Sequence, residues 1–248
     1  MTGVLVIALG KATRIVEVLL KAGKEYVCLM HVHTPVPEQI IRKTLSGFLG
    51  KINQIPPKRS AVKRQLRTRE IYYLQIIEIQ GQDVLFRVGC EAGTYIRTLC
   101  IQLGKALGTK AHMQELVRTK VGTCTDKEWH SLHDLKDAWE DNKEGELKKM
   151  LLPYERAVEH LPKIWVSDYA VDSLAHGAFL SVPGIVKLES DIEIGNTVAV
   201  LSLKNELIGI AMAKMNAEDM MSQKKGIATG ETKVFIERGV YPKYKKNE

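Results

Sequence analysis

One stretch of the chain changes its periodicity from that of a strand to that of a helix: V-G-C-E-A-G-T-Y-I-R-T-L-C-I-Q-L-G-K-A-L, residues 88–107. Every second residue up to this point is apolar, as in a pleated strand, at Val84, Phe86, Val88 and Cys90. A short polar break follows, and apolar residues then recur at helical spacing at Ile96, Leu99, Cys100, Leu103 and Leu107. The stretch therefore predicts a strand, a tight turn and a helix.

Arg97 lies in the first turn of this predicted helix, between Ile96 and Leu99. We expect its guanidinium to lie near the apolar face and to need an anionic partner, because an unpaired buried charge is costly. Two interpretations remain open. The arginine pairs with an aspartate or a carbonyl for structural reasons, or it holds a catalytic carboxylate ionised and oriented. Tyr26 has two interpretations as well, a core tyrosine or a ring that stacks on a nucleobase.

The composition is that of a globular protein that can bury a sizeable core. The chain has 248 residues, of which 45% are hydrophobic and 26% charged. No run approaches the roughly 18 apolar residues that suggest a membrane span. Residues 4–9 follow no basic segment and indicate a buried strand rather than a signal peptide. The four cysteines form no C-x-x-C pair, which disfavours a zinc knuckle or a disulfide framework and favours a reducing, cytoplasmic setting.

Positive charge is concentrated in one part of the chain. The net charge is +7, which is consistent with a nucleic-acid partner. Residues 51–69, here called the basic segment, contain no acidic residue and seven basic ones: Lys51, Lys58, Arg59, Lys63, Arg64, Arg67 and Arg69. One interpretation is a solvated loop without a ligand. The other is a loop that binds phosphates, each of which releases counterions on neutralisation.

The pattern along the chain predicts an α+β fold. Strands are expected at 4–9, 24–33, 71–79, 84–90 and 119–124, and helices at 13–22 (with Thr13 as N-cap), 37–49, 96–107 and 111–118. Residues 126–162 are charged and rich in helix formers, and Trp129, Leu132, Leu135, Ala138 and Trp139 form one helical stripe. From residue 163, a helix that ends at His176-Gly177 precedes short apolar strands at 182–186, 194–200 and 207–212, with a polar helical insert or loop at 218–225. This last pattern is typical of a small β-barrel or sandwich.

No motif indicates a metal or an organic cofactor. His31 and His33 share one strand face, but no third ligand is expected nearby, so a surface pair is favoured. His130 and His133 lack the spacing and the glutamate of a zinc protease helix. The glycines form no phosphate-binding motif.

Three strings resemble the TruB-type pseudouridine synthases: G-K-E-Y at residues 23–26, P-P-K-R-S-A-V-K-R-Q-L-R-T-R-E-I-Y-Y at 56–73 and G-T-Y-I-R-T-L-C at 93–100. They are most similar to the dyskerin-like branch that works in box H/ACA guide ribonucleoproteins. The last 85 residues resemble the PUA RNA-binding domain, in the strings A-V-D-S-L-A-H-G-A, V-P-G-I-V-K-L, K-G-I-A and R-G-V-Y-P-K.

The resemblance implies a fold and a reaction. It implies a mixed-sheet catalytic core without its N-terminal part (residues 1–125), a helical connection (126–162) and a β-barrel PUA domain (163–248). The family breaks the C1′–N1 bond of uridine and rejoins the base through C5, without a metal or an organic cofactor. An aspartate attacks or deprotonates the sugar, Arg97 pairs with it, Tyr26 packs on the base, and Leu99 lines the floor of the pocket.

The resemblance also implies RNA contacts and partners. The RNA-binding residues are Lys58, Arg59, Lys63, Arg64 and Arg67 in the basic segment, and His176, Gly177 and Arg238 in the PUA motifs. The partners are a guide RNA, an rRNA or tRNA substrate, and three small proteins: a zinc-ribbon-like one, a Gly/Arg-rich β-barrel one and a kink-turn-binding ribosomal-type one. The setting is the cytoplasm of an archaeon or the nucleolus of a eukaryote, and the short C-terminus favours an archaeon.

The family's aspartate is the residue that this sequence does not match. It stands in the motif G-T-L-D-P-x-x-T-G-V-L, and the chain opens M-T-G-V-L, so we expect the nucleophile to lie upstream of residue 1. Asp83, in a hairpin turn, and Asp126, at a boundary, do not replace it convincingly. This chain alone is therefore expected to be inactive. The alternative function is a non-catalytic RNA-binding protein that uses the basic segment and the PUA domain.

Overall fold

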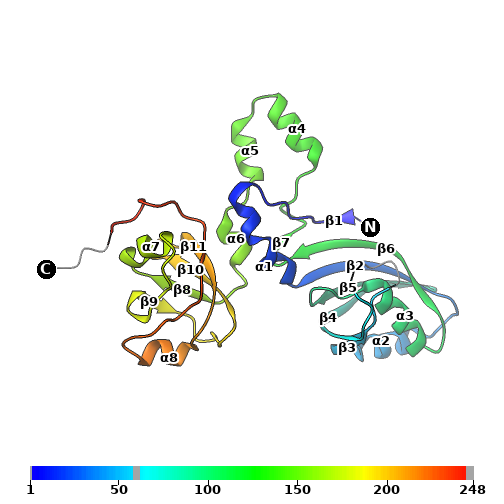
Figure 1. Ribbon diagram of the computed structural model, residues 1–248. Helices are drawn as coiled ribbons and strands as arrows, with labels where there is room; N and C mark the ends of the chain where they lie inside the picture. The colour runs from blue at the N-terminus through cyan, green and yellow to red at the C-terminus, as the bar shows by residue number, and fades with distance from the viewer. Residues whose placement is uncertain (1, 58–61, 244–248) are drawn as a thin grey trace. The chain divides into compact units, whose positions relative to one another are not determined.

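The computed structural model of the chain describes residues 2–57 and 62–243, which form two compact units (Figure 1). The first unit comprises Met1–Ile7 and Leu19–Leu151, and the second comprises Ala8–Val18 and Leu152–Glu248. Both combine helices with a mixed sheet, which confirms the predicted α+β class. Within the described part of the chain, no helix has the length and the apolar character needed to cross a membrane.

The first unit is built on a sheet with the strand order β1-β6-β2-β5-β4-β3, in which β7 also pairs with β6. The strands are β1 (Thr2–Gly3), β2 (Lys24–Val32), β3 (Gly50–Gln54), β4 (Arg67–Gln80), β5 (Asp83–Cys90), β6 (Ala111–Val121) and β7 (Cys124–Thr125). Only the pairing of β1 with β6 is parallel. The hairpin between β4 and β5 turns at Gly81, where φ is +60° and glycine carries no steric penalty.

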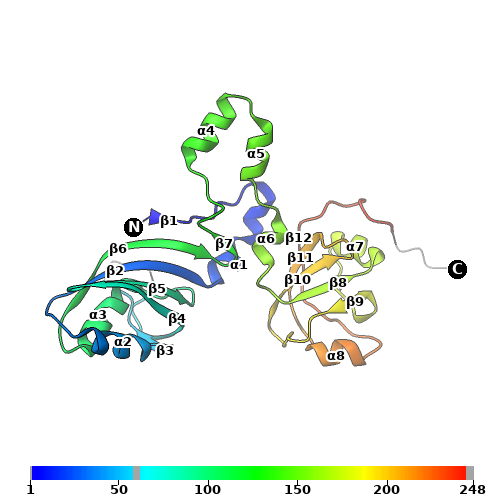
Figure 2. The same ribbon diagram turned by 180° about the vertical axis from the view of Figure 1, so that it is seen from behind.

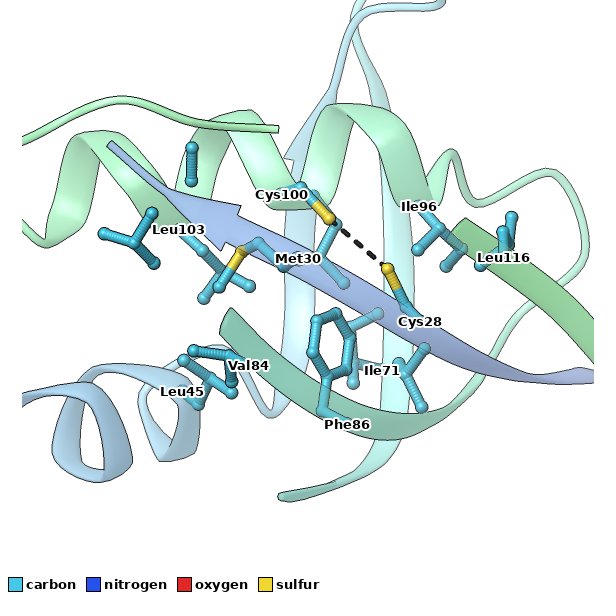
Figure 3. Close-up of a cluster of buried hydrophobic side chains, with 14 of the residues drawn as sticks. Cys28, Met30, Leu45, Ile71, Val84, Phe86, Ile96, Cys100, Leu103 and Leu116 are labelled. Carbon is cyan, nitrogen blue, oxygen red and sulfur yellow. Dashed lines mark hydrogen bonds between the residues drawn. The ribbon is translucent and has the colours of Figure 1, made fainter. Parts of the chain in front are cut away.

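Helices α2 (Glu38–Ser46) and α3 (Ile96–Ala106) cover one face of this sheet, as both views show (Figures 1 and 2). Their apolar stripes pack on the inward side chains of β2 and β5 in a continuous core (Figure 3). Met30, Phe86 and Leu103 are fully buried there, and each such side chain contributes about 1.5–3 kcal/mol by its removal from water. The core also holds the thiols of Cys28 and Cys100, whose sulfur atoms lie 3.6 Å apart.

Three sequence expectations for the first half of the chain were wrong. Residues 4–9 form no strand, because β6 pairs with the backbone only as far as Val4, and Leu5, Ile7 and Leu9 are exposed. Residues 111–118 belong to strand β6 and not to a helix, because pairing with β2 overrides their helix propensity. Thr13 is not an N-cap, because the 3₁₀ turn that precedes α1 (Val16–Lys21) already begins at Gly10.

The first unit also contains α4 (Leu132–Glu140) and α5 (Glu144–Met150). A capping box begins α4, in which the Ser131 hydroxyl accepts from Asp134 N and the Asp134 carboxylate accepts from Ser131 N. The predicted apolar stripe of this region is present, but most of it is exposed.

The second unit is built on a sheet with the strand order β12-β11-β10-β8-β9. Its strands are β8 (Lys163–Val166), β9 (Ile185–Leu188), β10 (Thr197–Ser202), β11 (Leu207–Met212) and β12 (Lys233–Val234), and its helices are α6 (Tyr154–Val158), α7 (Asp168–Ala175) and α8 (Ala217–Ser222). Helix α7 confirms the predicted helix before the strands, and α8 shows that residues 218–222 of the insert are helical rather than a loop. The first predicted strand is wrong in its first half, because residues 182–184 form a 3₁₀ turn before β9.

Residues 8–18, which the sequence analysis assigned to the catalytic core, are part of the second unit. Polar contacts hold them there. Arg14 Nη1 donates to Val234 O at 2.7 Å, and Lys11 Nζ pairs with Glu237 Oε1 at 2.8 Å.

Candidate active site

A pocket of about 200 Å³ lies in the first unit, beside the start of α3. Eight described residues line it: Tyr26, Pro57, Thr94, Tyr95, Ile96, Arg97, Met113 and Leu116. Tyr26 comes from β2 and Arg97 from α3. The fold therefore brings together two of the three residues predicted to be catalytic, although they are far apart in the sequence.

Tyr26 is held at an irregular point of the sheet. Its neighbours are Val88 on β5 and Arg118 on β6, and the register with β6 shifts between Glu25 and Tyr26. Such bulges bend a strand and redirect its side chains. Burial raises the pKa of the Tyr26 phenol, with a smaller effect in the same direction from Cys90, and the Arg118 guanidinium, which hydrogen-bonds the phenol, opposes this rise. The phenol is therefore neutral at pH 7, and its ring can stack on a nucleobase.

Arg97 lies at the rim of the pocket. The expectation that its guanidinium is held against the apolar face was wrong, because the side chain is exposed. The reason is helical geometry: Ile96, Leu99 and Leu103 fill the face of α3 that meets the sheet, and Arg97 falls outside that face. An exposed guanidinium at a pocket rim can bind a carboxylate or a phosphate through two parallel hydrogen bonds.

Leu99 is fully buried in the core and is not one of the eight described residues that line the pocket. The apolar lining is made by Ile96, Met113 and Leu116 instead. Sequence reasoning missed Met113 and Leu116 because it placed them on a helix. An interpretation of residues 111–121 as a strand beside β2 would have directed attention to them.

The turn before α3 is fixed by its own backbone and by one ion pair. Gly93 has φ +80°, a conformation that favours glycine. Thr94 donates to Glu91 O from both its hydroxyl, at 2.7 Å, and its amide, at 3.2 Å. Glu91 Oε1 pairs with Arg69 Nη1 at 3.2 Å. The G-T-Y-I-R string therefore presents Thr94, Tyr95 and Arg97 to the pocket from a well-defined turn.

The pocket offers a ring, an apolar lining and a cation, and its eight described lining residues include no carboxylate. Asp83, weighed above as a replacement nucleophile, lies 2.6 Å from His31 Nδ1 at the far end of β2 from Tyr26. The arrangement can hold a planar base and an anionic group beside it.

The basic segment passes the pocket. Its residue Pro57 is part of the lining. Lys58 and Arg59 lie outside the described residues. Lys63 and Arg64 are exposed, and Arg64 Nε donates to Pro56 O at 3.2 Å. Arg67 starts β4 and pairs across the sheet with Gln54.

In the second unit, His176, Gly177 and Arg238 come together at the C-terminal end of α7. His176 Nδ1 donates to Asp172 O at 2.8 Å, and Gly177 ends the helix with φ +90°. Arg238 Nε donates to Ala175 O at 3.2 Å. The fold thus joins two basic side chains from distant motifs into one exposed group.

The expectation that no third group lies near His31 and His33 was wrong. His112, from β6, lies 2.8 Å from His33, measured between Nδ1 and Nε2, and Asp83 is the partner of His31. Among residues 2–57 and 62–243, however, no group of three or more histidine, cysteine or acidic side chains is arranged to hold a metal ion.

Comparison with known proteins assigns this architecture to a class. Residues 33–96 match the N-terminal domain of the TruB family pseudouridylate synthases, residues 97–159 the C-terminal domain of tRNA pseudouridylate synthase B, and residues 162–234 the PUA domain. The chain therefore belongs to the TruB family of pseudouridine synthases, which are isomerases, and it carries a PUA domain. This confirms the resemblance seen in the sequence.

The relatives include named proteins of several archaea. The chain is 54% identical over 247 residues to a probable tRNA pseudouridine synthase B of Pyrococcus abyssi, covering 98% of this chain and 74% of that protein. It is 48% identical over 246 residues to the protein of the same name from Methanosarcina barkeri, covering 98% and 73%.

Solved structures agree with this assignment. A chain in a Cbf5-Nop10-Gar1 complex superposes with a TM-score of 0.93 at 52% identity, covering 98% of this chain and 75% of that one. A chain in an H/ACA RNP bound to a substrate RNA containing 2′-deoxyuridine gives 0.86 at 48% identity, covering 95% and 73%. These comparisons give no support to the expectation that the chain alone is inactive.

Proposed function

We propose that the chain isomerises uridine to pseudouridine as the synthase subunit of a box H/ACA guide ribonucleoprotein. The observation that carries this proposal is the pocket that Tyr26 and Arg97 share. The similarity to chains solved with Nop10 and Gar1, and in an H/ACA RNP with substrate RNA, supports guide RNA and two such small proteins as partners. The relatives named as tRNA synthases support tRNA as a second substrate.

The pocket residues suit the binding half of this reaction. A uracil ring would lie against Tyr26, with Met113 and Leu116 excluding water from its edge. Arg97 would pair at the rim with a carboxylate that is not among the described lining residues, and would keep it ionised to attack or deprotonate the sugar. The C1′–N1 bond breaks, the base turns, and the C1′–C5 bond forms. The C5 proton leaves, and N1 gains a proton.

Two basic regions, one in each unit, would bind the RNA. The basic segment contributes the lining residue Pro57 to the pocket and carries the exposed side chains of Lys63 and Arg64. The second group is His176 with Arg238 in the PUA domain. Contacts of this kind bind phosphates and position the RNA without reading its sequence.

Base-dependent binding separates this proposal from its rival, the non-catalytic RNA-binding protein. The probe is a stem-loop RNA with a single uridine in its loop, compared with the same RNA that is abasic at that position. Because stacking of one base contributes about 1–3 kcal/mol, the uridine RNA should bind at least about fivefold more tightly. Tyr26→Ala should abolish this difference. Tyr72→Ala should keep it, because Tyr72 is exposed on β4 and is not one of the described lining residues.

Equal binding of the two RNAs by the wild-type chain would favour the rival. Pseudouridine formation in the assembled particle is the second measurement, read by primer-extension stops after carbodiimide treatment. Turnover that survives both Tyr26→Ala and Arg97→Met would overturn the assignment of this pocket.

A further inference from the structure

Gln54 is an unusual residue for its place in the fold. It is the last residue of β3 and is only 2% exposed, although glutamine rarely occurs inside a core. A buried amide requires hydrogen-bond partners. One partner of Gln54, Tyr95, lies on the wall of the pocket.

The amide of Gln54 pairs with both backbone groups of Tyr95. Its Oε1 accepts from Tyr95 N at 2.9 Å, and its Nε2 donates to Tyr95 O at 3.2 Å. The side chain therefore pairs with the backbone of a residue far away in the sequence, as a neighbouring strand would. The remaining Nε2 proton is directed at Gln102 Oε1, 3.1 Å away.

Tyr95 lies where the pocket wall passes into α3. It is the N-cap residue of α3, and among the described residues its side chain makes no capping hydrogen bond. At this position a serine, threonine, aspartate or asparagine usually stabilises the helix, because its own side-chain oxygen accepts a hydrogen bond from a backbone amide of the first turn. In this chain Gln54 fixes the N-cap backbone from outside, one residue before Ile96 and two before Arg97.

A second contact keeps β3 and α3 in register. Gln102, one of the residues of α3, donates from Nε2 to Asn53 O at 2.7 Å. Beyond Gln54 the chain continues through Pro56 to Pro57, which lines the pocket and lies within the basic segment. Gln54 therefore joins the first part of the basic segment, in which it lies, to the wall that presents Arg97.

We infer that Gln54 is a positioning residue, which holds the Tyr95–Arg97 wall at a fixed place beside the start of the basic segment. The inference rests on the proposed function of the pocket and deepens it. Phosphate contacts along the basic segment can bring an RNA to the protein, and Gln54 ensures that the wall is in place to receive its base. Loss of the amide weakens recognition of the base and leaves phosphate binding as it was.

Two variants and one matched control test this. Gln54→Ala removes every contact of the amide. Gln102→Met removes only one hydrogen-bond partner of Gln54 and is the milder change. It can still be measured if Gln54→Ala does not fold. Gln82→Ala is the control, since Gln82 also donates from a part-buried amide to a backbone carbonyl, Val32 O at 2.7 Å, and is not one of the described lining residues.

The first readout is hydrogen exchange at the Tyr95 amide, followed in the full chain by NMR. Gln54→Ala should speed exchange by at least about tenfold, since a buried hydrogen bond is lost. Gln102→Met should have a smaller effect, and Gln82→Ala none. An unchanged rate in Gln54→Ala would overturn the inference whether or not the pocket binds uracil.

The second readout is the affinity for the uridine stem-loop divided by that for its abasic form. In Gln54→Ala this ratio should fall towards one, while the slope of affinity against salt stays that of the wild type. A ratio equal to that of Gln82→Ala would overturn the inference. A wild-type ratio of one would instead contradict the proposed function, and the Tyr95 exchange rate would still decide the role of Gln54.

Discussion

Helices α3 and α4 have similar sequence patterns and different surroundings. Both carry apolar residues at helical spacing, and the sequence predicted both. Five of the residues of α3 are buried, whereas α4, all of whose residues are described, buries only Ala138. Leu132 and Trp139 of α4 are 73% and 72% exposed. An amphipathic pattern thus predicts that a helix forms, but burial depends on whether the rest of the chain provides a surface.

The difference matters for the site because α3 carries the pocket wall. Its inner face is anchored in the core of the first unit by Leu99 and Leu103, and its first residues can therefore hold a defined place beside Tyr26. No residue of α4 is among the described lining residues of that pocket. The position of Arg97 is thus fixed by the burial of residues further along the same helix.

The largest expected effect is the loss of a core side chain from α3. Leu103→Ala should lower the free energy of unfolding by about 2–5 kcal/mol, because the removed atoms leave a cavity that the core cannot fill. Leu132→Ala in α4 should change it by less than about 0.5 kcal/mol, because the side chain is already in water. Urea unfolding followed by circular dichroism measures both. Equal losses would mean that the exposed stripe of α4 is covered in solution.

Two glycines test the same contrast through the opposite change, the addition of a methyl group. A Cβ on Gly104 of α3 would lie 2.4 Å from Ala111 N, in the backbone of β6. Gly104→Ala should therefore cost about 1–3 kcal/mol, because neither backbone can yield. Gly145 of α5 has no described atom within 4 Å of the same position.

Gly145→Ala should stabilise the protein by up to about 1 kcal/mol, because alanine is the better helix former. Opposite signs for the two substitutions, measured by urea unfolding, are the expected result. A loss at Gly145 as large as that at Gly104 would show that α5 is packed against a surface.

Local periodicity explains what could be predicted from the sequence. Strand β5, the turn at Gly93 and helix α3 follow one another within a short stretch, so their pattern indicated them correctly. The structure of residues 4–9 depends on how far the chain pairs with β6, and that of residues 111–118 depends on pairing with β2. Both partner strands come from elsewhere in the chain. Local propensity therefore predicted the wrong structure for both ranges. The pairing of distant strands is a property of the tertiary fold and leaves no signal in a short window.

The candidate site, like the fold, could be predicted from the sequence only where short local motifs indicated it. Tyr26 and Arg97 were found through short motifs, and the structure brings them to one pocket. The exposure of Arg97 was missed because its neighbours in sequence are apolar, although a helix turns the next side chain away from them. Gln54 was missed because one glutamine in a polar stretch has no local signature. Its role depends on Tyr95, which only the fold brings near.

The smallest expected effect concerns the other face of the sheet, where polar contacts replace the packing that α3 provides. Glu25, which precedes Tyr26, accepts from Tyr73 Oη at 2.5 Å and from Thr119 Oγ1 at 2.7 Å. Burial raises the pKa of Glu25, but these hydrogen bonds, with the nearby charges of Arg87 and Lys120, outweigh it, and the net pKa is lowered. Burial and the same carboxylate raise the pKa of Tyr73 to about 12.

A lowered pKa in the folded state has a definite sign for stability. The ionised carboxylate stabilises the fold above the unfolded-state pKa of about 4.3, and this contribution is lost as the pH falls through the folded-state value. Glu25→Gln should therefore destabilise the protein at pH 7, and the difference from wild type should shrink as the pH falls below about 4. The measurement is urea unfolding of both proteins from pH 7 to pH 3. Glu78→Gln, at an exposed carboxylate of β4, is the matched control. A difference that is the same at pH 7 and pH 3 would show that Glu25 acts through packing, and that both faces of the sheet depend on shape alone.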